Sequence, residues 1–256
     1  QGRSPGRSRG GRRVSGVSRV LGPVGSPVLW VAVLFFALML GMPQTAPLFE
    51  HTFPQVSPPV FDRDSFFALW LSHAGIVLVA SGAAALAGIG LAIFVTRLAG
   101  EDFRALVGSL ATIGQTFPPA AVLALSVPAL GFGPRPTIIA LFIYGLLPII
   151  ENAIAGLDGV PAAVREAARG MGLSSWQILR EVDLPLAAPL ILAGVRVSVT
   201  IAIGTATIGS TVGALTLGTP IFDGLAADKV PFVLQGAVLV ALFAILTDML
   251  FARLED

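Results

Sequence analysis

Residues 74–95 read AGIVLVASGAAALAGIGLAIFV, an unbroken stretch without a charged side chain. A membrane-spanning helix needs about 20 consecutive apolar residues, so this stretch predicts a transmembrane helix. Similar apolar segments occur at 27–42, 105–127, 137–155, 186–215 and 231–250. The segment 186–215 is long enough to tilt or to break near its end. The sequence therefore predicts an all-α membrane protein with about six transmembrane helices.

The composition of the whole chain supports this fold class. Hydrophobic residues make up 55% of the 256 residues, charged residues make up 12%, and the mean hydropathy is +0.86. A soluble domain carries about 25% charged residues, so a water-soluble fold could not cover this much apolar side chain. We read residues 27–256 as a single transmembrane domain.

The scarcity of reactive residues excludes several kinds of site. There is no cysteine, and the two histidines, His51 and His73, lie too far apart for a histidine-rich metal site. The one lysine, Lys229, is not part of the Gly-x4-Gly-Lys-Ser/Thr pattern of a phosphate-binding loop. We therefore expect no metal or cofactor on this chain. If ATP drives the protein, another subunit binds the ATP.

The distribution of basic residues predicts the topology. Residues 1–26 contain six arginines and no acidic residue, which favours a disordered cytoplasmic tail; a nucleic-acid-binding tail and a cleaved signal peptide are less favoured alternatives. With the N-terminus inside, twelve basic residues fall in inner segments and three in outer segments. This asymmetry predicts cytoplasmic N- and C-termini, with the proline-rich segment 43–72 as an external loop.

The longest inner segment, 156–185, is built from local helix signals. Pro161 suits the first turn of a helix over 162–169, and Gly170 and Gly172 would end that helix. Ser174 or Ser175 could cap a second short helix running to about Val182, and Pro185 would break the backbone before the next span. A simple connector would not need two short helices joined by a glycine turn.

The same segment resembles a known family. Membrane subunits of binding-protein-dependent ABC importers carry Glu-Ala-Ala-x3-Gly-x9-Ile-x-Leu-Pro in a cytoplasmic loop. This chain has the matching residues Glu166, Ala167, Ala168, Gly172, Val182, Leu184 and Pro185, with valine in place of isoleucine. The resemblance implies the type I ABC importer permease fold and a loop at 156–185 that docks into a groove on ATPase subunits, which hold the ATP and Mg. The alternative is a surface helix without a partner.

Further segments resemble the osmoprotectant branch of that family. They are GQTFPP at 114–119, GFG at 131–133, YGLLPI at 144–149 and the run 193–218, within a similarity that extends from about 74 to 254. The resemblance implies a bacterial inner-membrane permease for glycine betaine, choline, carnitine or proline betaine, working as a dimer with a second copy or a paralogue. Because the chain ends at Asp256 directly after the last expected span, we expect a separate substrate-binding protein.

Three alternatives to this function stay open from the sequence. Related permeases carry methionine, other amino acids or sulfonates. A secondary transporter predicts internal repeats and carboxylates near the membrane midplane, which are not evident. A membrane enzyme would need a nucleophile with its base, or a metal cluster, and neither is found.

An aromatic cage for a quaternary ammonium group is also lacking, so selectivity should reside in the binding protein.

Polar residues within the spans are candidates for a translocation path. We expect Glu151 and Arg196 to form a buried ion pair, with Asp158 as the alternative partner of Arg196. Hydroxyls and amides that could line a hydrated path are those of Gln115, Thr116, Tyr144, Thr200, Thr207 and Thr211. The spacing of the last three places them on one face of an α-helix. Bonding of these hydroxyls to carbonyls of their own helix is an equally good interpretation.

Overall fold

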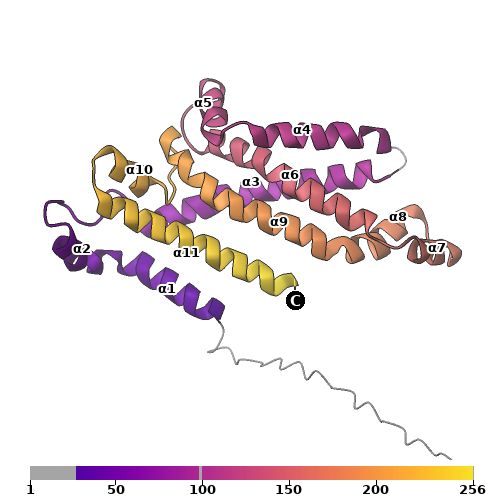
Figure 1. Cartoon of the computed structure of the whole chain (residues 1–256), viewed down its shortest axis with the longest axis horizontal. Helices are drawn as coiled ribbons and strands as arrows, with labels where there is room; N and C mark the ends of the chain where they lie inside the picture. The colour runs from indigo at the N-terminus through magenta and orange to yellow at the C-terminus, as the bar shows by residue number, and fades with distance from the viewer. Residues whose placement is uncertain (1–26, 98–99, 256) are drawn as a thin grey trace, which may run out of the picture.

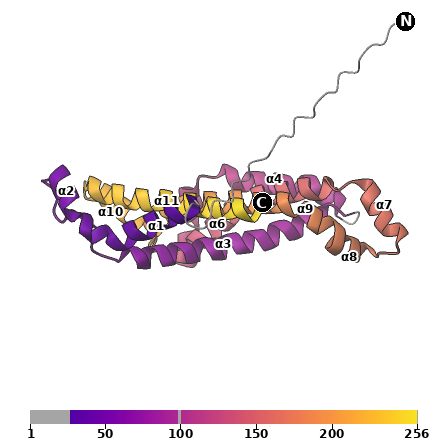
Figure 2. The same cartoon turned by 90° about the horizontal axis from the view of Figure 1, so that it is seen from below.

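The computed structural model describes residues 27–97 and 100–255, and every regular element within them is a helix. The expected disordered tail, 1–26, lies outside the described residues. Five helices carry most of the mass: α1 (Pro27–Gly41), α3 (Phe66–Val95), α6 (Pro134–Asp158), α9 (Leu184–Ala206) and α11 (Val230–Glu255). They run along the long axis of a narrow molecule, as both side views show (Figures 1 and 2).

Shorter helices occupy the two ends and one flank of this bundle. They are the 3-10 turn Met42–Thr45, α2 (Ala46–Thr52), the 3-10 turn Glu101–Phe103, α4 (Arg104–Thr116), α5 (Pro119–Leu130), α7 (Ala162–Gly170), α8 (Ser175–Ile178), the π-turn Leu179–Asp183, the 3-10 turn Thr207–Val212 and α10 (Thr219–Ala226). In Figure 1, α2 and α10 lie at one end of the molecule, and α7 and α8 lie at the other. We call the second the α7–α8 end.

The helices reproduce the predicted membrane character. Within the described residues, five helical segments are long and apolar enough to cross a membrane: Pro27–Thr52, Phe66–Val95, Pro134–Asp158, Ser175–Val212 and Val230–Leu254. A sixth span is possible if α4 and α5, which meet at 93°, count as one broken segment. The prediction of an all-α membrane protein with about six spans is thereby confirmed.

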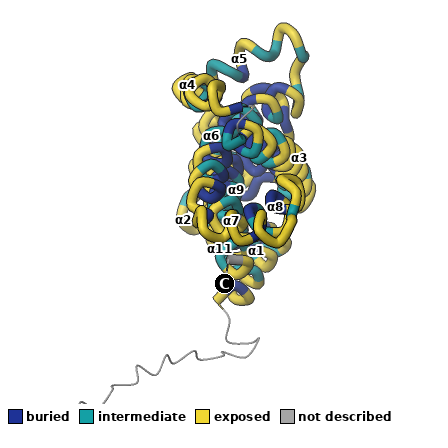
Figure 3. The backbone as a smooth tube through the Cα atoms, turned by 90° about the vertical axis from the view of Figure 1, so that its right-hand side faces the viewer, coloured by how far each residue is buried: buried dark blue, intermediate teal, exposed yellow. Residues whose placement is uncertain are grey.

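The core forms where α6 packs along both α3 and α9. Small residues allow these backbones to approach closely. A Cβ on Gly145 of α6 would lie 2.5 Å from Ser198 Oγ of α9, and one on Gly194 of α9 would lie 2.7 Å from Asn152 Cβ of α6. Viewed end-on in Figure 3, buried residues gather among these helices, while their outer sides are exposed. Exposed leucines and valines are what a surface in contact with lipid requires.

Three helix boundaries differ from the expectations. α3 begins at Phe66 rather than at residue 74, because the Ser65 hydroxyl accepts a hydrogen bond from Ala68 N–H at 3.2 Å and caps the helix there. The expected external loop 43–72 therefore contains α2 and the first turns of α3. The expected span 105–127 is two helices, because Pro118 and Pro119 lack the N–H groups that would continue α4.

The fifth span breaks near its end, as its length suggested. α9 passes into a 3-10 turn at Thr207, which ends at Gly213 with φ of +84°. His73 of α3 fastens this region: its Nδ1 accepts from Leu217 N–H at 3.2 Å, so its Nε2 carries the proton and donates to Ile203 O at 3.1 Å. The side chain of His73 is fully buried. One histidine thus joins α3, α9 and the segment after the 3-10 turn.

Candidate functional site

The α7–α8 end contains the predicted ATPase-docking loop, residues 156–185, which we call the coupling segment. The first helix that lies wholly within this segment is α7. The Pro161 carbonyl accepts the N–H groups of Val164 and Arg165 and so starts the helix. At the other end, Leu173 N–H donates to Ala168 O at 3.1 Å, and Gly172 adopts a φ of +86°. A residue with a Cβ is strained in that left-handed conformation, which explains why glycine stands at this position of the motif.

The second helix, α8, begins with a reciprocal cap. The Ser174 hydroxyl accepts from Gln177 N–H, and the Gln177 side chain accepts from Ser174 N–H at 2.9 Å. α8 then runs through the π-turn into α9 as one continuous segment, Ser175–Val212. The expected backbone break at Pro185 is wrong. The π-turn Leu179–Asp183 lies directly before it, where the hydrogen-bond ladder shifts and the missing N–H of proline is accommodated.

The seven motif residues divide into an outer and an inner set. Glu166, Ala167, Gly172 and Pro185 are exposed, Ala168 is buried, and Val182 and Leu184 are partly buried. The outer surface also presents two large side chains that the motif does not include. Met171 is 75% exposed and Trp176 is 68% exposed. Large apolar side chains held in water by a rigid turn are typical of a surface that receives a partner.

A buried carboxylate lies directly beneath this surface. Asp183, in the π-turn, is completely buried, and each of its oxygens accepts from a different arginine. Arg97, just past the end of α3, donates through Nη2 at 2.8 Å, and Arg165 of α7 donates through Nε at 2.8 Å. Arg165 also donates to the carbonyl of Leu157 in α6. We call the set Arg97, Arg165 and Asp183 the arginine clasp.

The expected partner of Arg196 is wrong. The Arg196 guanidinium of α9 binds Asp248 of α11, with Nε donating to Oδ1 at 2.6 Å and Nη2 to Oδ2 at 2.8 Å. Glu151 is exposed on α6, and the alternative partner, Asp158, binds Arg104 instead. The two expected partners are both on α6, whereas α11 supplies the carboxylate that faces Arg196.

The candidate path residues are mostly engaged with their own helices. Thr116, Thr200, Thr207 and Thr211 each donate to a carbonyl three or four residues earlier. Thr207 and Thr211 lie in the 3-10 turn, so the α-helical spacing that placed them on one face with Thr200 does not apply to them. Gln115 is used between elements: its Nε2 donates to Tyr144 O of α6 at 2.8 Å. Tyr144 is buried.

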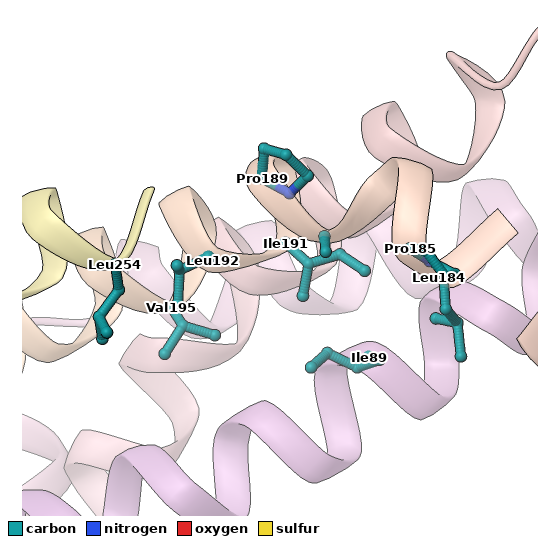
Figure 4. A pocket seen from close by; sticks show the side chains of 9 residues that line it. Ile89, Leu184, Pro185, Pro189, Ile191, Leu192, Val195 and Leu254 are labelled. Atoms are coloured by element: carbon teal, nitrogen blue, oxygen red, sulfur yellow. The ribbon is translucent and has the colours of Figure 1, made fainter. Parts of the chain in front are cut away.

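A groove of about 570 Å³ lies close to the coupling segment, between α3 and α9. Figure 4 shows Ile89 of α3, Leu254 of α11 and the α9 side chains Leu184, Ile191 and Val195 along it. All of its lining residues are apolar. A solute that carries a carboxylate or an ammonium group needs polar partners, and this groove offers none among its lining side chains.

Sequence reasoning missed Asp183, Arg97 and Asp248. A signal for Asp248 was present, since it is an acidic residue inside the apolar segment 231–250 and such a residue calls for a partner. Asp183 had no comparable signal. It stands in a polar stretch, and only the fold shows that it is buried against two arginines from distant positions.

Comparison with known proteins identifies the family. Residues 84–256 match the family described as the inner membrane component of binding-protein-dependent transport systems. The chain belongs to this permease family. The permease is 42% identical to the osmoprotectant import permease protein OsmY of Salmonella typhimurium, over 70% of this chain and 76% of OsmY. It is 38% identical to the glycine betaine/carnitine/choline transport system permease protein OpuCB of Bacillus subtilis, over 72% and 83% of the two chains.

Solved structures share the fold of the permease. A chain of the MetNI methionine ABC transporter in an inward-facing conformation aligns with a TM-score of 0.65 at 21% identity, over 72% of the permease and 92% of that chain. A second crystal form gives the same TM-score at 20% identity. The ABC importer permease fold that the motif implied is thereby confirmed.

Proposed function

We propose that this permease is the membrane-spanning subunit of an ATP-driven importer for a compatible solute such as glycine betaine, carnitine or choline. The observation that carries the proposal is the exposed motif surface on α7 and the turn after it, in a chain whose relatives are permeases for these solutes. The permease supplies no catalytic group. ATP and Mg belong to a partner ATPase, and the solute arrives on a separate binding protein.

The exposed motif surface is suited to the ATPase contact. Glu166 places a charge beside the small side chain of Ala167, so the outward face of α7 is slim and could enter a groove. Gly172 sets the sharp turn to α8, and the π-turn connects α8 directly to α9. Motion of a bound ATPase would therefore reach a membrane helix without an intervening flexible loop.

Two further parts of the proposal concern assembly and orientation. One chain supplies half of a pathway, and a second copy or a paralogous permease completes it. The α7–α8 end faces the cytoplasm, where an ATPase can reach it. Arg97 and Arg104 lie at this end, and so do the arginines of the segment 156–185, which are Arg165, Arg169 and Arg180. The positive-inside rule places such an excess of basic residues on the cytoplasmic side.

The test is uptake of labelled glycine betaine by cells that lack other osmoprotectant importers and express the permease with its ATPase and binding protein. Gly172→Val is compared with Gly170→Val at matched membrane levels. Valine is strained at the φ of +86° of Gly172, whereas Gly170 ends α7 without such a constraint. We expect uptake by the wild type and by Gly170→Val, competition by choline and carnitine, and loss of uptake in Gly172→Val.

Other outcomes separate the parts of this proposal. Absence of betaine uptake by a wild-type permease that still co-purifies with its ATPase would refute the substrate class and leave the importer. Full uptake and full ATPase association in Gly172→Val would refute the role given to the coupling segment.

A further inference from the structure

The arginine clasp joins helices that are separate along the sequence. Asp183 belongs to the π-turn between α8 and α9, Arg165 to α7, and Arg97 to the segment after α3. Arg165 extends the connection to α6 through the Leu157 carbonyl. One carboxylate therefore lies at the centre of a hydrogen-bonded link among four helical elements at the α7–α8 end.

Burial sets this link apart from other ion pairs at the same end. The Asp183 side chain has no exposure to solvent, whereas both members of the Arg104–Asp158 pair are nearly half exposed. A buried carboxylate is held in place only if its charge and its acceptor sites are satisfied, so its geometry is tightly fixed. The side chains of an exposed ion pair readily exchange each other for water, so such a pair couples the positions of its two helices only weakly.

The covalent chain alone does not connect the coupling segment to α3. α7 continues from α6 through residues 159–161, and α8 continues into α9, but α3 precedes both along the chain by many residues. α3 packs against α6 and α9, and Arg97 adds a charged connection at the α7–α8 end, since its guanidinium reaches the same carboxylate that holds α7. The outer side chains of the coupling segment and the end of α3 are thus joined through two arginines and one aspartate.

We infer that Asp183 is a positioning residue for energy coupling: with Arg97 and Arg165 it makes α3 move together with the coupling segment when the ATPase acts on that segment. This inference rests on the proposed function. Without the link, α9 would still follow α8, but the end of α3 would be held to the coupling segment by apolar packing alone and would follow it less closely, so that ATP would be hydrolysed without complete rearrangement of the pathway.

The experiment uses the complete importer, reconstituted in liposomes with its ATPase and binding protein. Solute uptake and ATP hydrolysis are measured together for the wild type, Arg97→Gln, Arg97→Lys and the control Arg104→Gln. In Arg97→Gln the carboxylate of Asp183 retains Arg165 as a charged partner, so the permease keeps its fold. Arg104→Gln removes an arginine from the same end whose ion-pair partner within the described residues is the exposed Asp158.

We expect Arg97→Gln to lower the ratio of solute transported to ATP hydrolysed roughly tenfold, a size typical of coupling between two sites. ATPase association and basal hydrolysis should stay at the wild-type level, Arg97→Lys should restore part of the ratio, and Arg104→Gln should leave it unchanged. A role in folding alone would lower both activities in proportion to the amount of folded protein and leave their ratio intact.

Two results would overturn the inference without touching the proposed function. One is a wild-type ratio in Arg97→Gln, and the other is an equal loss in Arg104→Gln. Failure of the wild-type permease to bind the ATPase at all would instead contradict the proposed function.

Discussion

At the scale of single residues, the Arg196–Asp248 pair joins two membrane helices through charge. Both side chains are partly exposed, at 27% and 41%, on segments that are otherwise apolar. A lone charge within a bilayer costs about 3 kcal/mol on insertion scales, so each member of such a pair depends on the other. The two parallel hydrogen bonds also fix the rotation of α9 against α11.

This pairing predicts non-additive effects on stability. We expect Asp248→Asn and Arg196→Gln each to destabilise the permease in detergent. The double variant should lose less than the sum of the two by about 1 kcal/mol, since partial exposure weakens the pair. Thermal unfolding measures this, with about 2–4 °C expected per kcal/mol in a chain of this size. Arg253→Gln, an exposed change on α11, is the control, and strictly additive losses would contradict the prediction.

At this scale the sequence predicts which residues need partners better than it predicts the partners. Arg196 stands out as an ionisable residue in an apolar segment, but pairing it with Glu151 assumed that α6 would face it. The rotation and depth of each helix decide that choice, and they are set by contacts such as Gly145 against Ser198. The sequence likewise did not indicate that the fully buried His73 joins separate segments, because both of its hydrogen-bond partners are backbone groups far from it in the sequence.

At the scale of elements, the coupling segment presents Met171 and Trp176 on a surface shaped by a glycine turn and a capping box. If an ATPase covers this surface, a probe at Met171 should become protected. The permease has no cysteine, so Met171→Cys provides a single reactive thiol. We expect its reaction with a maleimide to slow at least about fivefold when the ATPase is bound, because interface cores exclude water.

The matched control for this experiment is Leu225→Cys. Leu225 of α10 is 64% exposed, close to the exposure of Met171, but it lies at the opposite end of the molecule (Figure 1). Its labelling rate should not change on addition of the ATPase. Equal protection at both positions would indicate aggregation, and lack of protection at Met171 would contradict the proposed contact.

Local signals predicted most elements and failed where tertiary packing decides the outcome. Pro161, Gly172 and Ser174 act through their own turn of backbone, and the structure has α7 and α8 where these residues placed them. Proline was less informative. Pro118 and Pro119 separate two helices at 93°, whereas Pro185 lies in a continuous helix because a π-turn precedes it. A proline in the sequence therefore does not show whether the helix ends there or continues with a shifted pattern of backbone hydrogen bonds.

At the scale of the whole molecule, basic residues of the described chain concentrate toward the α7–α8 end. Five of them lie in the segments at that end: Arg97, Arg104, Arg165, Arg169 and Arg180. A sixth, Arg253, lies in the last turn of α11, which points toward that end. The opposite end has Arg63, Arg135 and Lys229, of which Arg63 binds Asp223 and Lys229 donates to Ser57 O. Arg97, Arg104 and Arg165 at the α7–α8 end are paired with acidic residues as well, so the asymmetry lies in the number of basic residues, six against three.

This asymmetry predicts the orientation of the permease in the membrane. In intact spheroplasts, a membrane-impermeant maleimide should label Leu225→Cys and leave Met171→Cys unlabelled until the membrane is permeabilised. Because the two side chains are similarly exposed, a difference in labelling reports the side of the membrane on which each lies and not how accessible it is within the protein. The reverse pattern would place the coupling segment outside the cell, where no ATPase could supply it with ATP, and would refute the orientation and the proposed function together. Labelling of both before permeabilisation would mean mixed insertion, which the presence of six basic residues at one end and three at the other argues against.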